Sequence, residues 1–303
     1  MTPNARAAAL MTLGMAAFAC EDALLKLLSR GISIGQLLVV LGLGGMAIFG
    51  AWVARSPGGL RWRDLIHPGV VLRNLAEGVC AICFLTALSI GDLSIASAIL
   101  QALPLLMTLG AAVVLGEPVG WRRWTSIAVG FAGVILIVRP GTDAFQPGSI
   151  LALIAVVALA VRDLVTRRLP VQIGSGLLTA SAFGAMAVAG AVLVVIGGQP
   201  MVVPGPAEAG MMAVSLAFGL LGYMTMVIAT RIGEIGAIAP FRYSRLVFAI
   251  ILGVLVFGER PDGWTLAGAG IIAGAGGYAM WREARLRGRT RRRRPAGSLT
   301  RPG

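Results

Sequence analysis

The sequence predicts an all-α integral membrane protein in which ten transmembrane helices form two inverted repeats of five helices each. The composition is the first observation behind this prediction: 57% of the 303 residues are hydrophobic and only 13% are charged, whereas soluble domains carry roughly 25% charged residues. The apolar residues fall in long unbroken runs without the alternation of a barrel strand, so the spans are expected to be helices.

An internal repeat is the second observation. The stretch Gly91–Gly141 consists of two apolar runs separated by a turn with Gly116 and Glu117, and the stretch from Gly233 has the same plan around Gly258-Glu259. The two glycine–glutamate pairs are 142 residues apart. Because each copy holds five spans, an odd number, the second copy must cross the membrane in the opposite sense, as in secondary transporters. The expected units are residues 1–141, residues 142–284 and a basic tail, residues 285–303.

The individual spans follow from the length of each apolar run. A transmembrane helix needs about 20 mostly apolar residues, and ten segments meet this requirement. In chain order they are Ala7–Leu28, Ile34–Ala54, Gly69–Ile90, Leu93–Leu115, Trp121–Val138, Ser149–Arg167, Ile173–Ile196, Ala209–Thr230, Ile235–Phe257 and Trp264–Trp281.

The basic residues predict the orientation in the membrane. Nine of the 26 lysine and arginine residues follow Trp281, and basic residues are enriched on the cytoplasmic side. Both termini are therefore expected in the cytoplasm, with the protein in the inner (plasma) membrane and the tail on anionic lipid. Arg73, counted with the basic residues between the second and third spans, is expected on the same side. This placement of charge argues against nucleic acid as a partner, despite a net charge of +13.

Two motifs carry a resemblance to a known family. The run AILQALPLLMTLGAAVVLGEPVGWRRWTSIAVGFAGVILIVRPG and the segment AVRDLVTRRLP resemble the drug/metabolite transporter superfamily, EamA type. The second turn departs from the first, because Arg260 stands where the first copy has Pro118. The resemblance implies a permease built from two EamA-like repeats, with no cofactor and no ATP-binding domain. Consistently, the sequence contains no GxxxxGK[ST] phosphate-binding motif.

The ninth span supplies the first candidate substrate-binding residues. Arg242 and Arg245 are spaced i, i+3 and share a helix face, and paired guanidinium groups suit a carboxylate or a phosphate. Tyr243 offers a ring for stacking and a hydroxyl group. The alternative is that both arginines are structural and pair with carboxylates of other spans, since charges within spans are usually functional or paired.

Glu77 and Gln101 complete the predicted binding site. Glu77, in the third span, has a depth that suits a partner for Arg242 or Arg245, or it titrates and couples proton movement to transport. Gln101, in the fourth span, aligns with Tyr243 in the repeat, so both are expected beside the cavity. Pro104 follows Gln101 closely and is expected to kink this span or to free a backbone carbonyl.

Two matched pairs of charges suggest gating. Asp22 and Lys26 in the first span correspond to Asp163 and Arg167 in the sixth, at a separation of 141 residues. Their spacing allows an ion pair within each span. They are either interfacial ion pairs at span ends or two gates that close alternately. Asp22 is preferred over Glu21 because Asp22 is the residue that is repeated.

These features predict a secondary transporter that moves a small anionic or zwitterionic metabolite by alternating access. The alternatives are an exporter of drug-like or neutral metabolites with purely structural charges and, more remotely, a membrane scaffold or sensor. An enzyme or a metal site is not expected, because the single histidine, His67, lies in a loop. The motif Gly270–Gly274 is expected to support close packing within the monomer or a homodimer.

Overall fold

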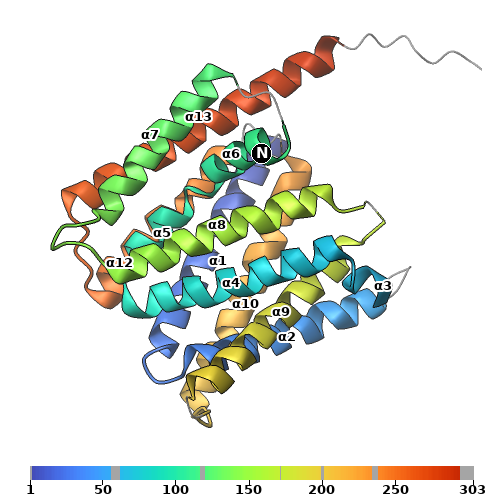
Figure 1. The fold of residues 1–303 in the computed structure, drawn as a ribbon, viewed down its shortest axis with the longest axis vertical. Helices are drawn as coiled ribbons and strands as arrows, with labels where there is room; N and C mark the ends of the chain where they lie inside the picture. Colours follow the sequence, from blue (N-terminus) through green and yellow to red (C-terminus); the bar gives the residue numbers. More distant parts are fainter. Residues whose placement is uncertain are drawn as a thin grey trace, which may run out of the picture.

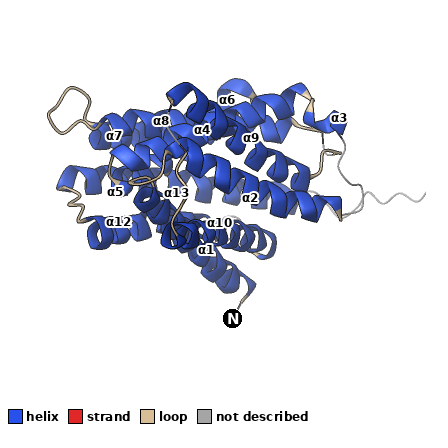
Figure 2. Cartoon of the chain, turned by 90° about the horizontal axis from the view of Figure 1, so that it is seen from below, coloured by secondary structure: helices blue, strands red, loops and turns tan. Residues whose placement is uncertain are grey.

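All the regular elements that the computed structural model describes are helices (Figure 2). The described residues are 2–55, 62–116, 120–170, 172–198, 201–233 and 238–293; the predicted turn at Glu117 and Pro118 and the start of the ninth span lie outside them. In chain order the helices are α1 (Pro3–Leu28), α2 (Ile34–Ala54), α3 (Trp62–Leu65), α4 (Pro68–Ile90), α5 (Leu93–Leu100), α6 (Leu103–Val114), α7 (Trp121–Val138), α8 (Pro147–Arg168), α9 (Ser175–Gly197), α10 (Pro206–Ile232), the 3₁₀ helix η1 (Ala239–Tyr243), α12 (Ser244–Phe257) and α13 (Gly263–Arg293).

Within these ranges, nine segments are long and apolar enough to cross a membrane. They correspond to the first nine predicted spans. The tenth, Trp264–Trp281, lies inside α13 but is not among the nine. Its sequence is rich in glycine and begins and ends with tryptophan, which makes it less apolar than the others, and α13 continues as a helix to Arg293.

Two of the nine spans are discontinuous, and they occupy corresponding positions in the two repeats. The fourth span is divided between α5 and α6 at Gln101, just before Pro104. The ninth span begins as the 3₁₀ helix η1, which contains Pro240, and continues as α12. Proline has no backbone N–H and cannot complete a regular helix at its position. Both breaks lie in the interior of the bundle, where transporters place their sites.

Helices of the two halves pack against one another in matched pairs (Figure 1). The second and seventh spans, α2 and α9, lie side by side, as do the fifth span α7 and helix α13. The contact of α1 with α10 has its counterpart in the contact of α4 with α8, and the contact of α1 with α12 has its counterpart in that of α8 with α5 and α6. Each contact thus recurs with the roles of the halves exchanged, which is the arrangement that two related repeats produce.

Glycine permits the closest of these approaches. In the pair of α7 and α13, a Cβ atom added at Gly133 would lie 2.8 Å from the Gly268 carbonyl oxygen, and one added at Gly268 would lie 2.6 Å from the Gly133 oxygen. The expected motif is not the one used here, because a Cβ atom at Gly270 or Gly274 would meet nothing within 4 Å. Those two glycines sit on a different face of α13 from Gly268, so their packing within the monomer is a wrong prediction.

Candidate functional site

A cavity of about 420 Å³ lies between the two halves of the bundle. Helices α1, α2, α4, α8, α9 and α10 line it together with the breaks in the fourth and ninth spans. Its polar lining is Glu21, Arg73, Glu77, Gln101, Arg162, Asp163, Thr166, Thr179, Tyr223, Arg242, Tyr243 and Arg245. Sequence positions that are far apart therefore meet around one space.

The five residues predicted to bind substrate, Glu77, Gln101, Arg242, Tyr243 and Arg245, all line this cavity. The two broken spans meet there, because the Gln101 side-chain amide donates a hydrogen bond of 3.2 Å to the backbone carbonyl of Arg242. The Tyr243 hydroxyl is buried without a hydrogen-bond partner in the described structure, and a Cβ atom at Gly276 of α13 would overlap it. Tyr243 thus directs its hydroxyl towards α13 and offers its ring, rather than its hydroxyl, to the cavity.

Arg162 forms the central ion-pair network of the cavity. Its guanidinium lies 2.9 Å from the Glu77 carboxylate and 2.8 Å from that of Asp163. The expected pairing of Glu77 with an arginine of the ninth span is therefore wrong, as is the expected pairing of Asp163 with Arg167, whose side chain is exposed. The packing of α4 on α8 brings Glu77 and Arg162 to the same depth, whereas Arg167 is in the last turn of α8, nearer to water.

Arg245 is neutralised by the first span. Its Nε and Nη2 atoms donate to one oxygen of Asp22, at 3.1 Å and 2.7 Å, and its guanidinium lies 5.3 Å from the centre of the Phe18 ring. Asp22 is 3% exposed and does not pair with Lys26, which again corrects a local pairing expected from spacing. A buried carboxylate is destabilised unless a cation or hydrogen-bond donors lie at its own depth, and the contact of α1 with α12 supplies a cation.

Arg73 has a different place from the one expected. It lies inside α4, is 8% exposed and lines the cavity. Its guanidinium donates to neutral acceptors: the hydroxyl of Thr166 at 3.2 Å, the Asn74 side-chain oxygen at 3.1 Å and the Leu178 carbonyl at 2.9 Å. In the sequence Arg73 serves as an orientation signal, and its position within the first two turns of an apolar helix is the one feature that indicates an inward-facing side chain.

Aromatic rings form another part of the lining. Phe49 stacks on Phe183 with ring centres 5.6 Å apart and planes 15° apart, and it meets Tyr223 edge-on at 5.7 Å. These rings come from α2, α9 and α10. The cavity thus offers aromatic surfaces to a flat group, near the charged residues of α4, α8 and η1.

The end of the bundle opposite the cavity is closed by a cluster of polar groups from both halves, which we call the closed-end cluster: Lys26, Gly91, Leu93, Ser94 and Glu259. The ammonium of Lys26 lies 2.8 Å from the Glu259 carboxylate and 2.6 Å from the Gly91 carbonyl oxygen. The same carboxylate accepts hydrogen bonds from the backbone N–H groups of Leu93 (2.6 Å) and Ser94 (3.0 Å) and from the Ser94 hydroxyl. Glu259 thereby holds the N-terminus of α5, where a negative charge is favourable.

The protonation of Glu259 reflects these contacts. Burial alone would raise its pKa, but the hydrogen bonds from Lys26 and from the Ser94 hydroxyl and backbone outweigh burial, and the pKa lies below its usual range. Glu259 is therefore ionised at neutral pH, and the cluster is intact there.

The cavity and the closed-end cluster lie towards opposite ends of the bundle. The cavity lining includes Arg73 and Thr179 near the starts of α4 and α9, and Thr166 near the end of α8. The cluster instead lies where α1 and α12 end and α5 begins. The ion pair of Arg139 with Asp262, at 2.7 Å, also joins the two halves at that end.

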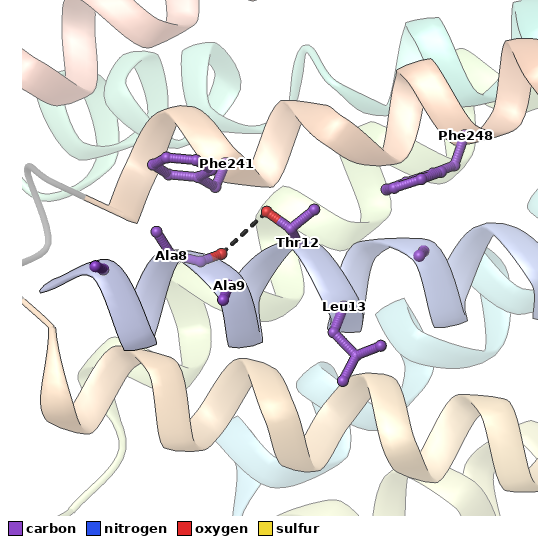
Figure 3. A pocket seen from close by; sticks show the side chains of 8 residues that line it. Ala8, Ala9, Thr12, Leu13, Phe241 and Phe248 are labelled. Atoms are coloured by element: carbon purple, nitrogen blue, oxygen red, sulfur yellow. Dashed lines mark hydrogen bonds between the residues drawn. The ribbon is translucent and has the colours of Figure 1, made fainter. Parts of the chain in front are cut away.

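A second hollow lies on the outside of α1, against η1 and α12 (Figure 3). Its lining includes Ala8, Leu13, Phe241 and Phe248 and contains no charged side chain. The hydroxyl of Thr12 is already used, because it donates to the Ala8 carbonyl at 3.0 Å. This groove suits an apolar chain and offers nothing that would orient a charged metabolite.

Comparison with known proteins agrees with this architecture. Residues 5–139 and 146–277 each match the EamA-like transporter family, and the chain belongs to that family. It is therefore a multi-pass transporter of the plasma membrane and not an enzyme. The two matched ranges correspond to the two halves of the bundle.

Two similar proteins whose names give a substrate are 26% and 27% identical to this chain. The chain is 27% identical over 221 residues to a protein of Rickettsia prowazekii named S-adenosylmethionine uptake transporter, with 73% of each chain covered. It is 26% identical over 211 residues to a protein of Rhizobium johnstonii named riboflavin transporter, with 66% of this chain and 64% of the relative covered. A crystal structure with 20% sequence identity superposes with a TM-score of 0.58 over 92% of this chain and 99% of its own, which shows a shared fold.

Proposed function

We propose that this chain is a secondary transporter that moves a small anionic or zwitterionic metabolite by alternating access. The observation that carries the proposal is the position of Arg242. It lines the cavity, and no carboxylate of the described residues pairs with its guanidinium, whereas Arg162 and Arg245 are both neutralised. An unpaired charge at this depth is costly. A substrate carboxylate or phosphate that enters the cavity would relieve that cost and gain charge-assisted hydrogen bonds.

The aromatic part of the lining narrows the substrate class. S-Adenosylmethionine and riboflavin, named for the relatives, both join a flat heteroaromatic ring to a polar chain. The rings of Phe49, Phe183 and Tyr223 suit such a flat group, while Arg242 suits an anionic end. The proposed substrate is therefore a metabolite with a heteroaromatic ring and a charged chain.

Alternating access is supported by the difference between the two ends of the bundle, since the cavity lies towards one end and the closed-end cluster closes the other. The proposed halves are residues 1–141 and 142–284 in inverted orientation, with both termini in the cytoplasm. In that orientation the cavity faces the cytoplasm and the closed-end cluster seals the outer side. Transport would require the halves to move so that the cluster opens and the cytoplasmic side closes.

The test is ligand binding by the purified protein in detergent, with S-adenosylmethionine and riboflavin as probes. Arg242→Ala is compared with Arg231→Ala, an exposed arginine at the end of α10 outside the cavity. Loss of a charge-assisted contact is expected to weaken binding of an anionic or zwitterionic probe roughly 10- to 100-fold in Arg242→Ala and to leave Arg231→Ala unchanged. Equal affinity of Arg242→Ala and the wild type would favour the alternative of a neutral substrate with structural charges.

A further inference from the structure

We propose that Glu21 is the specificity-determining residue that binds the cationic group of a zwitterionic substrate. This inference rests on the proposed function and adds to it the second charge of the ligand. Glu21 lies in α1 immediately before Asp22, but the two carboxylates have different surroundings. Successive residues of a helix point about 100° apart, so Asp22 meets Arg245 on α12, while Glu21 lines the cavity beside α10.

The space for the Glu21 carboxylate is provided by a glycine. A Cβ atom added at Gly219 of α10 would lie 2.6 Å from one carboxylate oxygen of Glu21 and 3.0 Å from the other. The carboxylate therefore rests against bare backbone at the cavity wall. No lysine or arginine in the described ranges forms an ion pair with it, and no described donor forms a hydrogen bond to it.

A carboxylate without an ionic partner is unusual among the charged residues that line the cavity. Three carboxylates line it, and the other two, Glu77 and Asp163, both pair with Arg162. Among the lining arginines, Arg245 is paired and Arg73 has neutral acceptors. One carboxylate, Glu21 on α1, and one guanidinium, Arg242 on η1, remain without an ionic partner in the part of the chain that the structure describes.

Two unpaired charges of opposite sign on different helices fit a ligand that carries both signs. An isolated charge away from water is strongly disfavoured unless it is paired, so a ligand with separate cationic and anionic groups satisfies both residues at once. A purely anionic ligand would leave Glu21 without an ionic partner. The proposed substrate is therefore zwitterionic rather than purely anionic. A compound like S-adenosylmethionine fits both residues, whereas riboflavin carries neither charge.

Three probes with the same adenosyl ring separate the two charges. S-Adenosylmethionine carries a sulfonium, an ammonium and a carboxylate; its thioether analogue, with a 2-hydroxy acid in place of the amino acid, keeps the carboxylate and carries no cation; 5′-methylthioadenosine carries no charge. Binding of each probe is measured with the wild type, Glu21→Gln and Arg242→Ala. Glutamine preserves the size of the side chain, and unchanged binding of methylthioadenosine shows that a variant is folded.

Glu21→Gln is expected to weaken binding of S-adenosylmethionine roughly 10- to 100-fold and to leave methylthioadenosine unchanged. Gly219→Ala is a second variant that keeps every charge; its Cβ atom displaces the carboxylate, so the same selective loss is expected. If Glu21→Gln binds S-adenosylmethionine as the wild type does, while Arg242→Ala does not, the role of Glu21 is refuted and the proposed function stands. If the wild type prefers the uncharged probe and neither variant alters that preference, the role of Glu21 and the proposed function are both refuted.

Discussion

Replacing Glu259 with glutamine should favour a conformation in which the closed end of the bundle is open. The Glu259 carboxylate is the centre of the closed-end cluster, and its side chain is only 4% exposed, against 11% for Lys26. Glutamine retains one oxygen acceptor but loses the charge and the second oxygen. The ammonium of Lys26 would then keep the Gly91 carbonyl as its acceptor and face an amide in place of a carboxylate.

The size of the effect follows from the contacts that are lost. Breaking a buried ion pair by removing one partner costs about 3–5 kcal/mol, and each hydrogen bond to a charged group contributes about 1.5–3 kcal/mol. Because glutamine can still accept from one of the two backbone N–H groups, we expect a loss of about 2–3 kcal/mol. If the cluster exists only in the state with this end closed, that loss shifts the conformational equilibrium about 30- to 150-fold towards the open state.

Chemical labelling of a buried position measures this shift. Ser97 lies in α5 next to the cluster and is 1% exposed. A cysteine at position 97, in a background without Cys20, Cys80 and Cys83, should react slowly with a membrane-impermeant maleimide, and Glu259→Gln should accelerate the reaction by at least tenfold. Asp262→Asn is the matched control at the same end, because its ion pair with Arg139 is half-exposed and such pairs contribute little.

The result that would refute this reasoning is equal labelling of the wild type and Glu259→Gln. Equal acceleration by Asp262→Asn would also count against it, since it would mean that any loss of charge at this end loosens the bundle. A double variant with Lys26→Met should accelerate labelling by less than the two single effects combined, because both changes remove the same ion pair.

Three further predictions follow from the same structure. Acid should open the cluster: the pKa of Glu259 is lowered in the folded protein, so its contribution is present above the ordinary pKa of a glutamic acid and is lost as the pH falls through the lowered value; labelling at position 97, divided by that of an exposed cysteine at the same pH because the thiolate is the reacting species, should rise only in acid, and Glu259→Gln should show no such rise. Gly133→Ala should lower the free energy of unfolding in detergent by about 1–3 kcal/mol through overpacking against α13, whereas Gly270→Ala, which meets open space, should not; equal effects would contradict the packing. Glu77→Gln should lower the thermal midpoint by removing one of the two carboxylates on Arg162, at about 1.5–3 kcal/mol; an unchanged midpoint would mean that Asp163 alone suffices.

Much of the fold could be predicted because membrane spans obey local rules. The length and hydropathy of each run place nine of the spans, and Pro104 marks the break in the fourth. The residue types of the cavity were also accessible, since charges inside a span are rare. The specific partners were not: spacing along α1 suggested Asp22 with Lys26, and spacing along α8 suggested Asp163 with Arg167.

The different surroundings of Glu21 and Asp22 could not be predicted from the sequence. Repetition singled out Asp22, but the repeated position is the one buried against Arg245. The position of Glu21 is taken by Arg162 in the second repeat, so the carboxylate is not repeated, and its exposure to the cavity depends on Gly219, almost two hundred residues away. A signal confined to one copy of a repeat is invisible to an argument from the repeat itself.

The sequence by itself determined that this chain is a helical membrane protein with a repeat and a few intramembrane charges, because hydropathy and chain length act over twenty residues. Only the tertiary structure decided which charges neutralise one another, which remain free in the cavity, and which end of the bundle is closed. Electrostatic pairing in a low-dielectric interior depends on distances of a few ångströms between different helices, and those distances are set by packing, which no local pattern encodes.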